Sequence, residues 1–277
     1  MAEQREKNII DQTTRPITKD ILITEFRKIG IQKGDILVVH SSLSKIGWVV
    51  GGAIDVVEAL MEVVTKEGTL IMPAHSGGNS EPSVWQHPSV PEMWWPTIRD
   101  NLPPFRPDVT PNRMMGKIAD LFRTYPGVIR SNHPQNSFTA WGKNAPIITA
   151  NQPYFPSFGE NSPLGRIYEM GGKILLLGVG HSNNSSLHLA ESKANIPNNP
   201  MESQGAAVLE NGQRKWVEWD DFSYEDEDFP EIGKAFEESI GYIRNKIVNA
   251  EAILLSQVDL VDFAVEWMKT HRSYLLN

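Results

Sequence analysis

The chain has 277 residues, 40% of them hydrophobic, and a formal net charge of −8 at pH 7. Because it contains no cysteine, disulfides, thiolate metal sites and a cysteine acyl-enzyme are excluded. The acidic balance argues against a nucleic-acid partner, since duplex binding needs clustered cations. It suits a small cationic partner or simply ordinary solubility.

The sequence has no run of about 18 apolar residues, the length that a membrane-spanning helix needs. The segment from Met1 to Arg15 is polar and charged rather than built like a signal sequence. We therefore expect a cytoplasmic protein with no membrane partner. We expect one domain over residues 1–277, with residues 1–17 as a flexible N-terminal arm.

The first half of the chain alternates helix and strand signals. Thr18 is a suitable N-cap for a first helix, and Gly30 is a suitable stop. Residues 35–40 form a short, β-branched apolar run that predicts a buried strand. Apolar residues recur at helical spacing over 54–64, and 69–73 is a second buried strand. This strand–loop–helix–strand unit favours parallel pairing.

The middle of the chain is less regular. Residues 75–111 hold many prolines and little periodicity, which predicts a long irregular excursion over one face. Residues 115–122 are predicted to be a helix. The run 173–179, Lys-Ile-Leu-Leu-Leu-Gly-Val, is the clearest buried strand in the sequence.

The last third predicts a hairpin followed by two helices. Asn211-Gly212 between extended runs is a strong hairpin signal, so we expect an antiparallel element to join the sheet. Residues 232–240 predict a helix, and Ser256 with Asp259 resembles a capping box before the last one. The expected fold is α/β, with a mixed, largely parallel central sheet flanked by helices, irregular loop excursions and a β-hairpin near the C-terminal third.

A turn rich in serine and glycine, residues 40–53, joins the first strand to the second helix. Its pair Gly51-Gly52 would let the backbone approach a phosphate, whose charge is favoured at a helix N-terminus. It matches neither the dinucleotide-binding nor the P-loop pattern. The alternative is a tight entry into the helix with no ligand.

The loop after the third buried strand leads into a short helix that carries His188 and Glu191. Their spacing of three puts both on one helix face, where the carboxylate can orient the imidazole and raise its basicity. The carboxyl end of a buried strand is also where α/β sheets place ligands. A solvated surface pair is the alternative. A second alternative is a zinc hydrolase, because His181 together with His188 and Glu191 could bind zinc, although their spacing differs from H-E-x-x-H.

Two further polar segments leave their roles open. In the loop 130–142, His133 either bonds a ligand or fixes the turn before Pro134. The acidic stretch 218–228 is either a solvated surface or the negative wall of a site for a polycationic substrate. In the second case Asp228, beside apolar Phe229, is the expected inward member.

Taken together in this order, the motifs resemble the aminoglycoside 3-N-acetyltransferase family. The resemblance runs from about Thr18 to the C-terminus. Each motif is modest alone, but an accidental match of the whole ordered set is improbable. The motifs are Val39-His-Ser-Ser-Leu-Ser-x-Ile-Gly-x-x-x-Gly-Gly52, Gly68-Thr-Leu-Ile-Met-Pro73, Arg130-Ser-Asn-His-Pro134, Ser137-Phe138 with Ala140 and Gly142, Ser162-Pro-Leu-Gly165 and Leu187-His-Leu-Ala-Glu191.

The resemblance implies an antibiotic-resistance enzyme, distinct from the GCN5-related acetyltransferases, that uses acetyl-CoA and no metal. It implies transfer to the 3-amino group of a 2-deoxystreptamine aminoglycoside. His188 matches the family's essential histidine and Glu191 its neighbouring carboxylate. The residues implied for the cofactor are Ser41, Ser42, Leu43, Val50, Gly51, Gly52, Ser137 and Phe138. Those expected at the substrate are His75, Asp221 and Asp228.

One departure from the family keeps alternatives open. Many relatives have an aspartate six residues before the histidine, where this chain has Ser182, so that role is unfilled or passes to Glu191. The chain could therefore acetylate another small amine, or bind CoA with little catalysis. As an acetyltransferase it would use His188 as general base, with direct transfer in a ternary complex. The exposed Trp94-Trp95 region would serve either a pocket or a homodimer contact.

Overall fold

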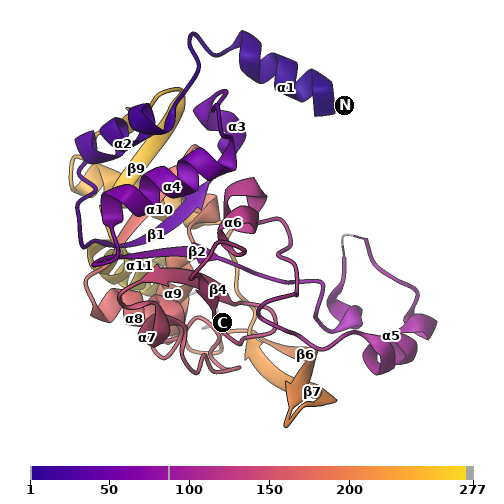
Figure 1. The fold of residues 1–277 in the computed structure, drawn as a ribbon. Coiled ribbons are helices and arrows are strands. Elements are labelled where there is room, and N and C mark those ends of the chain that lie inside the picture. The colour runs from indigo at the N-terminus through magenta and orange to yellow at the C-terminus, as the bar shows by residue number, and fades with distance from the viewer. Residues whose placement is uncertain (1, 87, 273–277) are drawn as a thin grey trace.

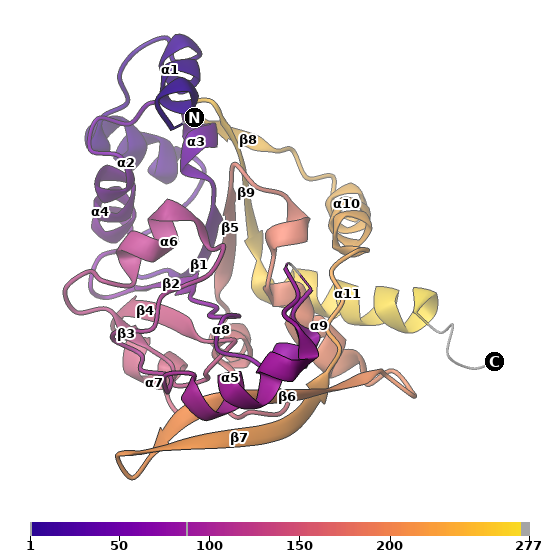
Figure 2. The same cartoon turned by 90° about the vertical axis from the view of Figure 1, so that its right-hand side faces the viewer.

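The structure is a computed structural model that describes residues 2–86 and 88–272. These residues form a seven-stranded central sheet and a separate two-stranded sheet. Helices cover both faces of the central sheet (Figures 1 and 2). Within the described ranges no helix is both long enough and apolar enough to cross a bilayer.

The central sheet has the strand order β3-β4-β2-β1-β5-β9-β8. β1 pairs in parallel with β2 and β5, and the four other pairings are antiparallel. The predicted mixed sheet is confirmed, but its parallel part is limited to three central strands and is smaller than expected. The strands are β1 (Ile36–Ser41), β2 (Thr69–Pro73), β3 (Ile129–Arg130), β4 (Phe138–Gly142), β5 (Lys173–Leu177), β8 (Asn245–Ile247) and β9 (Ala250–Ser256).

One face of the sheet is covered by α2 (Lys19–Lys28), α4 (Ala53–Val64) and α6 (Gly116–Phe122). The predicted first helix is confirmed, and the Thr18 side chain accepts a hydrogen bond from the N–H of Ile21 as its N-cap. β1 and β2 are buried on both faces, which explains their continuous apolar sequence.

The opposite face is covered by five helices that share a second apolar core. The last of them begins where the sequence predicted, since the side chain of Ser256 accepts from the N–H of Asp259. This helix packs against the one that carries the histidine and glutamate pair. The five are α7 (Ala145–Thr149), α8 (Pro163–Glu169), α9 (Ser186–Ala194), α10 (Phe229–Ser239) and α11 (Gln257–His271).

The N-terminal segment, predicted to be a flexible arm, contains the helix α1 (Ala2–Asp11). The chain after it is attached to the serine- and glycine-rich turn. The hydroxyl of Thr13 accepts from the N–H of Trp48 at 2.9 Å, and Ile17 exchanges backbone hydrogen bonds with the same turn. The turn itself contains the short helix α3 (Leu43–Ile46), and Figure 1 shows α1 close to it.

The predicted hairpin is present, but it does not join the central sheet. β6 (Met201–Glu210) and β7 (Gln213–Phe222) form a sheet of their own. It packs instead on the irregular excursion, because Asn79 and Phe105 both donate hydrogen bonds to the carbonyl of Ala207. That excursion is irregular as expected, apart from η1 (Pro82–Val84), η2 (Glu92–Trp94) and α5 (Trp95–Asn101).

Candidate active site

The loops that follow the parallel strands meet at the start of helix α9, which carries His188 and Glu191. The two side chains come together as their spacing predicted, with Nδ1 of His188 2.5 Å from Oε2 of Glu191. The histidine side chain is 17% exposed and the glutamate side chain 4%. An ionised carboxylate only accepts hydrogen bonds, so in a neutral imidazole paired with it the proton is on Nδ1 and the lone pair on Nε2.

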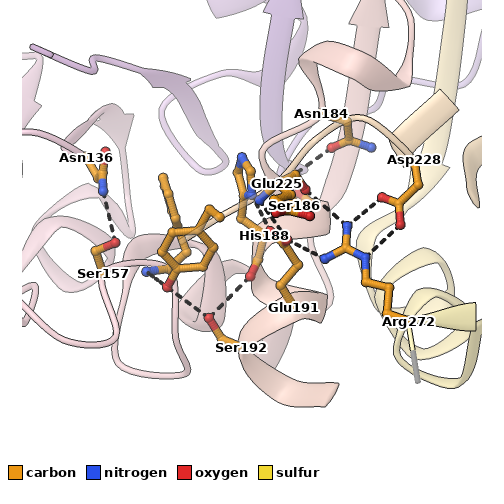
Figure 3. A network of polar contacts seen from close by, with 12 residues as sticks. Asn136, Ser157, Asn184, Ser186, His188, Glu191, Ser192, Glu225, Asp228 and Arg272 are labelled. Atoms are coloured by element: carbon orange, nitrogen blue, oxygen red, sulfur yellow. Dashed lines mark hydrogen bonds and ion pairs between the residues drawn. The ribbon is translucent and has the colours of Figure 1, made fainter. Parts of the chain in front are cut away.

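The second carboxylate oxygen of Glu191 is also fully engaged (Figure 3). Oε1 accepts from Nη1 of Arg272 at 2.5 Å and from the backbone N–H of Glu225 at 3.1 Å. A buried carboxylate stays charged only when such donors replace the water it has lost. These contacts therefore fix both the charge and the orientation of the group that holds His188.

Arg272 lies just beyond the end of α11 and joins two carboxylates. Its Nε and Nη2 bind Asp228 in a fork, at 2.6 and 2.5 Å. Burial alone would lower the pKa of Arg272, but the hydrogen bonds to Asp228 and Glu191 raise it above its usual value. Asp228 is thus held by Arg272, and the structure does not present it as the substrate residue that the sequence suggested.

Aromatic rings enclose the imidazole of His188. The ring of Phe158 stacks on it at 4.9 Å, and the rings of Tyr224 and Phe229 lie at 5.3 and 4.8 Å. The hydroxyl of Tyr224 forms a hydrogen bond of 3.1 Å with the hydroxyl of Ser192, which lies on α9 together with His188. The imidazole plane is therefore set by packing as well as by Glu191.

The imidazole faces a cavity of about 500 Å³, here called the histidine cavity. It lies at the carboxyl ends of β1 and β2 and at the loop after β5, where α/β sheets place ligands. Its lining residues are Val39, His40, Ser41, Pro73, His75, Gly77, Met114, Met115, Gly116, Ala119, Gln135, Asn136, Phe158, Val179, Ser182, Asn183, Asn184, Ser185, His188, Tyr224, Asp226 and Phe229.

Two further histidines line this cavity, and both are neutral. Burial and the nearby His188 lower the pKa of His40 to about 3 and likewise that of His75 to about 3. Nε2 of His40 and Nδ1 of His75 are buried without a hydrogen-bond partner among the described residues. Both rings can therefore exchange a hydrogen bond with a ligand, and only His188 is prepared by a carboxylate.

A second cavity, of about 680 Å³, adjoins the first and is here called the loop cavity. The two share Ser41 and Gly116 in their walls. The loop cavity lies between helix α1 and the serine- and glycine-rich turn. Its lining residues are Arg5, Glu6, Ile9, Ser41, Ser42, Leu43, Ser44, Gly47, Trp48, Val49, Gly52, Gly116 and Lys117.

Comparison with known proteins identifies the family of the chain. The family model for aminoglycoside 3-N-acetyltransferase matches residues 38–269. The chain belongs to that family. It is 42% identical to the SPbeta prophage-derived aminoglycoside N(3')-acetyltransferase-like protein YokD of Bacillus subtilis, over 94% of this chain and 96% of the relative. The crystal structure of YokD matches with a TM-score of 0.94, 41% identity and coverage of 98% of this chain and 100% of that one.

Two more members of the family bear on the chemistry. The chain is 32% identical to aminoglycoside N(3)-acetyltransferase VII of Streptomyces paromomycinus, over 95% of this chain and 96% of the relative. A structure described as AAC-IIIb binary with CoASH matches with a TM-score of 0.83, at 27% identity over 92% of this chain and 97% of that one. As a member of this family the protein is an acetyltransferase.

The structure divides the residues that the family resemblance assigned to the cofactor. Ser41, Ser42, Leu43 and Gly52 line the loop cavity. Four others do not line either cavity. Val50 is exposed and Gly51 is half-buried, whereas Ser137 and Phe138 are fully buried just before and at the start of β4.

Ser137 and Phe138 have structural tasks behind the histidine cavity. The hydroxyl of Ser137 accepts from Nε of Arg130 and donates to the carbonyl of Ala74, both at 2.9 Å. Phe138 packs its ring edge-to-face against His75 at 5.2 Å. The two residues thus support the wall of the histidine cavity from behind.

The glycine pair does not offer a free phosphate cradle. The N–H of Gly51 donates to Asp55 at 3.0 Å, and the N–H of Gly52 donates to the carbonyl of Val49 at 3.0 Å. Gly52 has a φ of +57°, which favours glycine, and it serves as the N-cap of α4. The alternative of a tight entry into the helix describes these N–H groups better.

Asp221, expected at the substrate, lies outside both cavities. It is 2% exposed and accepts from the N–H groups of Ser157 and Phe222. Burial raises the pKa of its carboxyl to about 6, against the opposing effect of these hydrogen bonds. His75 is the one substrate candidate of the three that lines the histidine cavity.

The histidine and serine before α9 also have defined places. His181, in η3 (His181–Asn183), is buried with Nε2 2.9 Å from Glu237, away from the His188 pair. In the described part of the chain no group of three metal-binding side chains assembles. Ser182 lines the histidine cavity, and its hydroxyl donates to Oδ1 of Asn183. Glu191 is the carboxylate in contact with His188.

Several residues of the site were not predicted. His40 stood inside a recognised motif, and its position at a strand end was a usable signal. Phe158 and Tyr224 lie in irregular segments without periodicity. Nothing in the sequence marked Arg272 as part of the site, because a cation at the C-terminal end of a helix is normally explained by its favourable interaction with the helix dipole.

Proposed function

We propose that the protein transfers the acetyl group of acetyl-CoA to the 3-amino group of a 2-deoxystreptamine aminoglycoside, with His188 as general base. Residues 1–277 would act as one domain, and the activity would confer antibiotic resistance. The observation that carries the proposal is the His188–Glu191 pair at 2.5 Å on one of two adjoining cavities. The family supports the reaction, and the relative bound to CoASH supports the donor.

The chemistry requires a base at the amine, because an ammonium group has no lone pair for attack. Nε2 of His188 would accept the proton as the amine nitrogen attacks the thioester carbon. The carbon–sulfur bond then breaks and CoA leaves as the thiolate, which takes up a proton. General-base catalysis of this kind is worth about a hundred- to ten-thousand-fold, and Glu191 stabilises the imidazolium while it lasts.

The loop cavity is the proposed place of acetyl-CoA, which supplies the activated acetyl group. It is the larger of the two, and its walls carry the hydroxyls of Ser41 and Ser42 together with the cations Arg5 and Lys117. Cations and hydroxyls are suitable partners for phosphate groups. Ser41 and Gly116, shared by both cavities, mark where the acetyl group would meet the amine.

A second candidate is transfer to another small amine. Among the described residues that line the histidine cavity, Asp226 alone carries a carboxylate. The two other acidic residues expected at the substrate lie elsewhere, since Asp228 is bound by Arg272 and Asp221 is buried outside the cavity. A polycationic aminoglycoside would gain more from several carboxylates. This observation favours an amine of lower charge, for which His40 and His75 offer neutral hydrogen-bonding groups.

One experiment tests both candidates. Purified protein is mixed with acetyl-CoA and either 2-deoxystreptamine aminoglycosides or simple monoamines, and release of the CoA thiol is followed. The absence of cysteine keeps protein thiols out of the signal. We expect aminoglycoside-dependent release that His188→Ala reduces at least a hundredfold. Release with monoamines alone would select the second candidate, and release unaffected by His188→Ala would refute the general base.

A further inference from the structure

One heavily engaged charged group near the active site touches neither cavity. Arg272 is 7% exposed, lies just after α11, and is absent from the walls of both cavities. Its guanidinium nevertheless reaches three partners in the site, namely Glu191, Asp228 and the carbonyl of Glu225. Burying charged groups is costly unless they pair with one another and are hydrogen-bonded, as these are.

The contacts form a chain of alternating charge that ends at the imidazole. Asp228 binds the fork of Arg272, Arg272 binds Oε1 of Glu191, and Oε2 of Glu191 binds Nδ1 of His188 (Figure 3). The three contacts are each 2.5 Å. Since the guanidinium is planar and rigid, its orientation on Asp228 dictates where Glu191 is held.

We propose that Arg272 is a positioning residue for the acetyl transfer, which fixes Glu191 against His188 and sets the pH range in which His188 can act as a base. This inference rests on the proposed function. Arg272 does not touch the reacting atoms. It acts through Glu191, and Asp228 acts in turn by offsetting part of its charge.

The electrostatic consequence has a definite sign. Glu191 favours the protonated imidazole, and the positive charge of Arg272 weakens that preference. Removing Arg272 leaves Glu191 uncompensated, so His188 should keep its proton to higher pH. Removing the charge of Asp228 instead strengthens the effect of Arg272, so His188 should lose its proton at lower pH.

Other charged and titratable groups face His188 from the surrounding elements and stay constant in this comparison. His40 comes from β1, His75 follows β2, and Tyr224 and Asp226 lie in the segment before α10. The two histidines are neutral near pH 7 because burial lowers the pKa of each to about 3. A difference between variants therefore reports on Arg272 and Asp228.

The first measurement needs no substrate. The imidazole of His188 is titrated by NMR in protein labelled with ¹⁵N-histidine, with His188→Asn used to assign its signal. We expect Arg272→Gln to move the midpoint upward by about one pH unit, and Asp228→Asn to move it downward by about half a unit. Lys269→Gln is the matched control, since it removes an exposed cation of α11 and should leave the midpoint in place.

The second measurement follows activity. The acidic limb of the kcat/KM profile should move with the NMR midpoint, upward in Arg272→Gln and downward in Asp228→Asn. Arg272→Lys keeps the charge but loses the fork. Its NMR midpoint should therefore equal that of the wild type, while its kcat should be about tenfold lower than that of the wild type. KM for acetyl-CoA should not change, because Arg272 does not line the loop cavity.

The opposite signs separate positioning from mere support of the fold. A purely structural role would make both variants less stable without moving the midpoint in opposite directions. Coincident midpoints in wild type and Arg272→Gln, or shifts of both variants in one direction, would overturn the inference. Should Arg272→Gln fail to fold, Asp228→Asn and Arg272→Lys decide alone. An inactive wild type with the expected NMR shifts would refute the proposed function and leave the electrostatic role of Arg272 standing.

Discussion

Two of the three histidines at the histidine cavity are held neutral by burial. The folded protein lowers the pKa of His40 to about 3, and the unfolded chain would return it to its ordinary value near 6.5. Between these two values the unfolded state binds more protons than the folded state. The stability conferred by the neutral ring is therefore complete above about pH 6.5 and is lost progressively as the pH falls toward 3.

This linkage gives a prediction for His40→Gln, which removes the titratable ring. The free energy of unfolding of the wild type should fall between pH 7 and pH 5 by about 2 kcal/mol more than that of the variant. Urea unfolding at the two pH values measures it. His271→Gln, which removes an exposed histidine, should behave as the wild type. An equal loss in wild type and His40→Gln would show that His40 is not the group responsible.

The residue scale also shows what a sequence can and cannot predict. The His188–Glu191 contact was predictable because it lies within one helical turn. The contact of Arg272 with Glu191 spans 81 residues and depends on how α11 packs against α9. Asp228 was expected to face the substrate, but it lines neither cavity and binds a cation distant in sequence. Local spacing predicts local pairs, and the buried partners of those pairs come from tertiary packing.

At the scale of elements, most helices and strands followed from local pattern, including the capped starts of α2 and α11. The pairing of strands was harder to predict from the sequence. The Asn211-Gly212 turn forces β6 and β7 into a hairpin, but no local signal says whether its edge joins the central sheet. Helix α1 was missed because its sequence is polar, and it lines the loop cavity opposite the turn after β1 instead of contributing to a core.

Helix α1 offers a test of the loop cavity. Arg5 lines this cavity, whereas Lys7, on the same helix, is exposed and pairs with Asp11. If the cavity holds acetyl-CoA, Arg5→Ala should raise KM for acetyl-CoA about fivefold, the loss of one charge-assisted contact of about 1 kcal/mol. Lys7→Ala should leave it unchanged. Initial rates at varied acetyl-CoA measure both. Equal values of KM in the two variants would remove Arg5 from the cofactor site.

The hairpin offers a test of backbone strain. Gly212 has a φ of +78° with open space around it, so Gly212→Ala changes backbone preference without a clash. The cost should be about 1 kcal/mol, or about 2–4 °C in Tm. Gly180→Ala, also in open space but at a φ of −103°, should be neutral or slightly stabilising. Thermal unfolding compares them. A Gly212→Ala variant as stable as Gly180→Ala would contradict the assigned turn.

At the scale of the whole molecule, the two adjoining cavities bear on the order of chemical events proposed above. Two adjoining cavities would let both substrates bind at once, because their walls meet at Ser41 and Gly116. The chain has no cysteine to carry an acetyl group. His188 is paired at Nδ1 and enclosed by three rings, an arrangement that suits a base held in place. If both cavities are occupied at once, direct transfer between the bound substrates is the mechanism expected.

Direct transfer predicts intersecting lines when initial rates are measured at varied acetyl-CoA and several fixed concentrations of amine. It also predicts that protein incubated with acetyl-CoA alone keeps its mass. An acyl-enzyme would instead give parallel lines and a mass increase of one acetyl group. His188→Ala gives a further test. If His188 is the base, imidazole added to the solution should raise the rate of the variant, because it can take over the missing proton transfer. Acetylation of the wild-type protein at His188 before amine is added would mean that the histidine is a nucleophile, and that the two cavities serve successive steps rather than one.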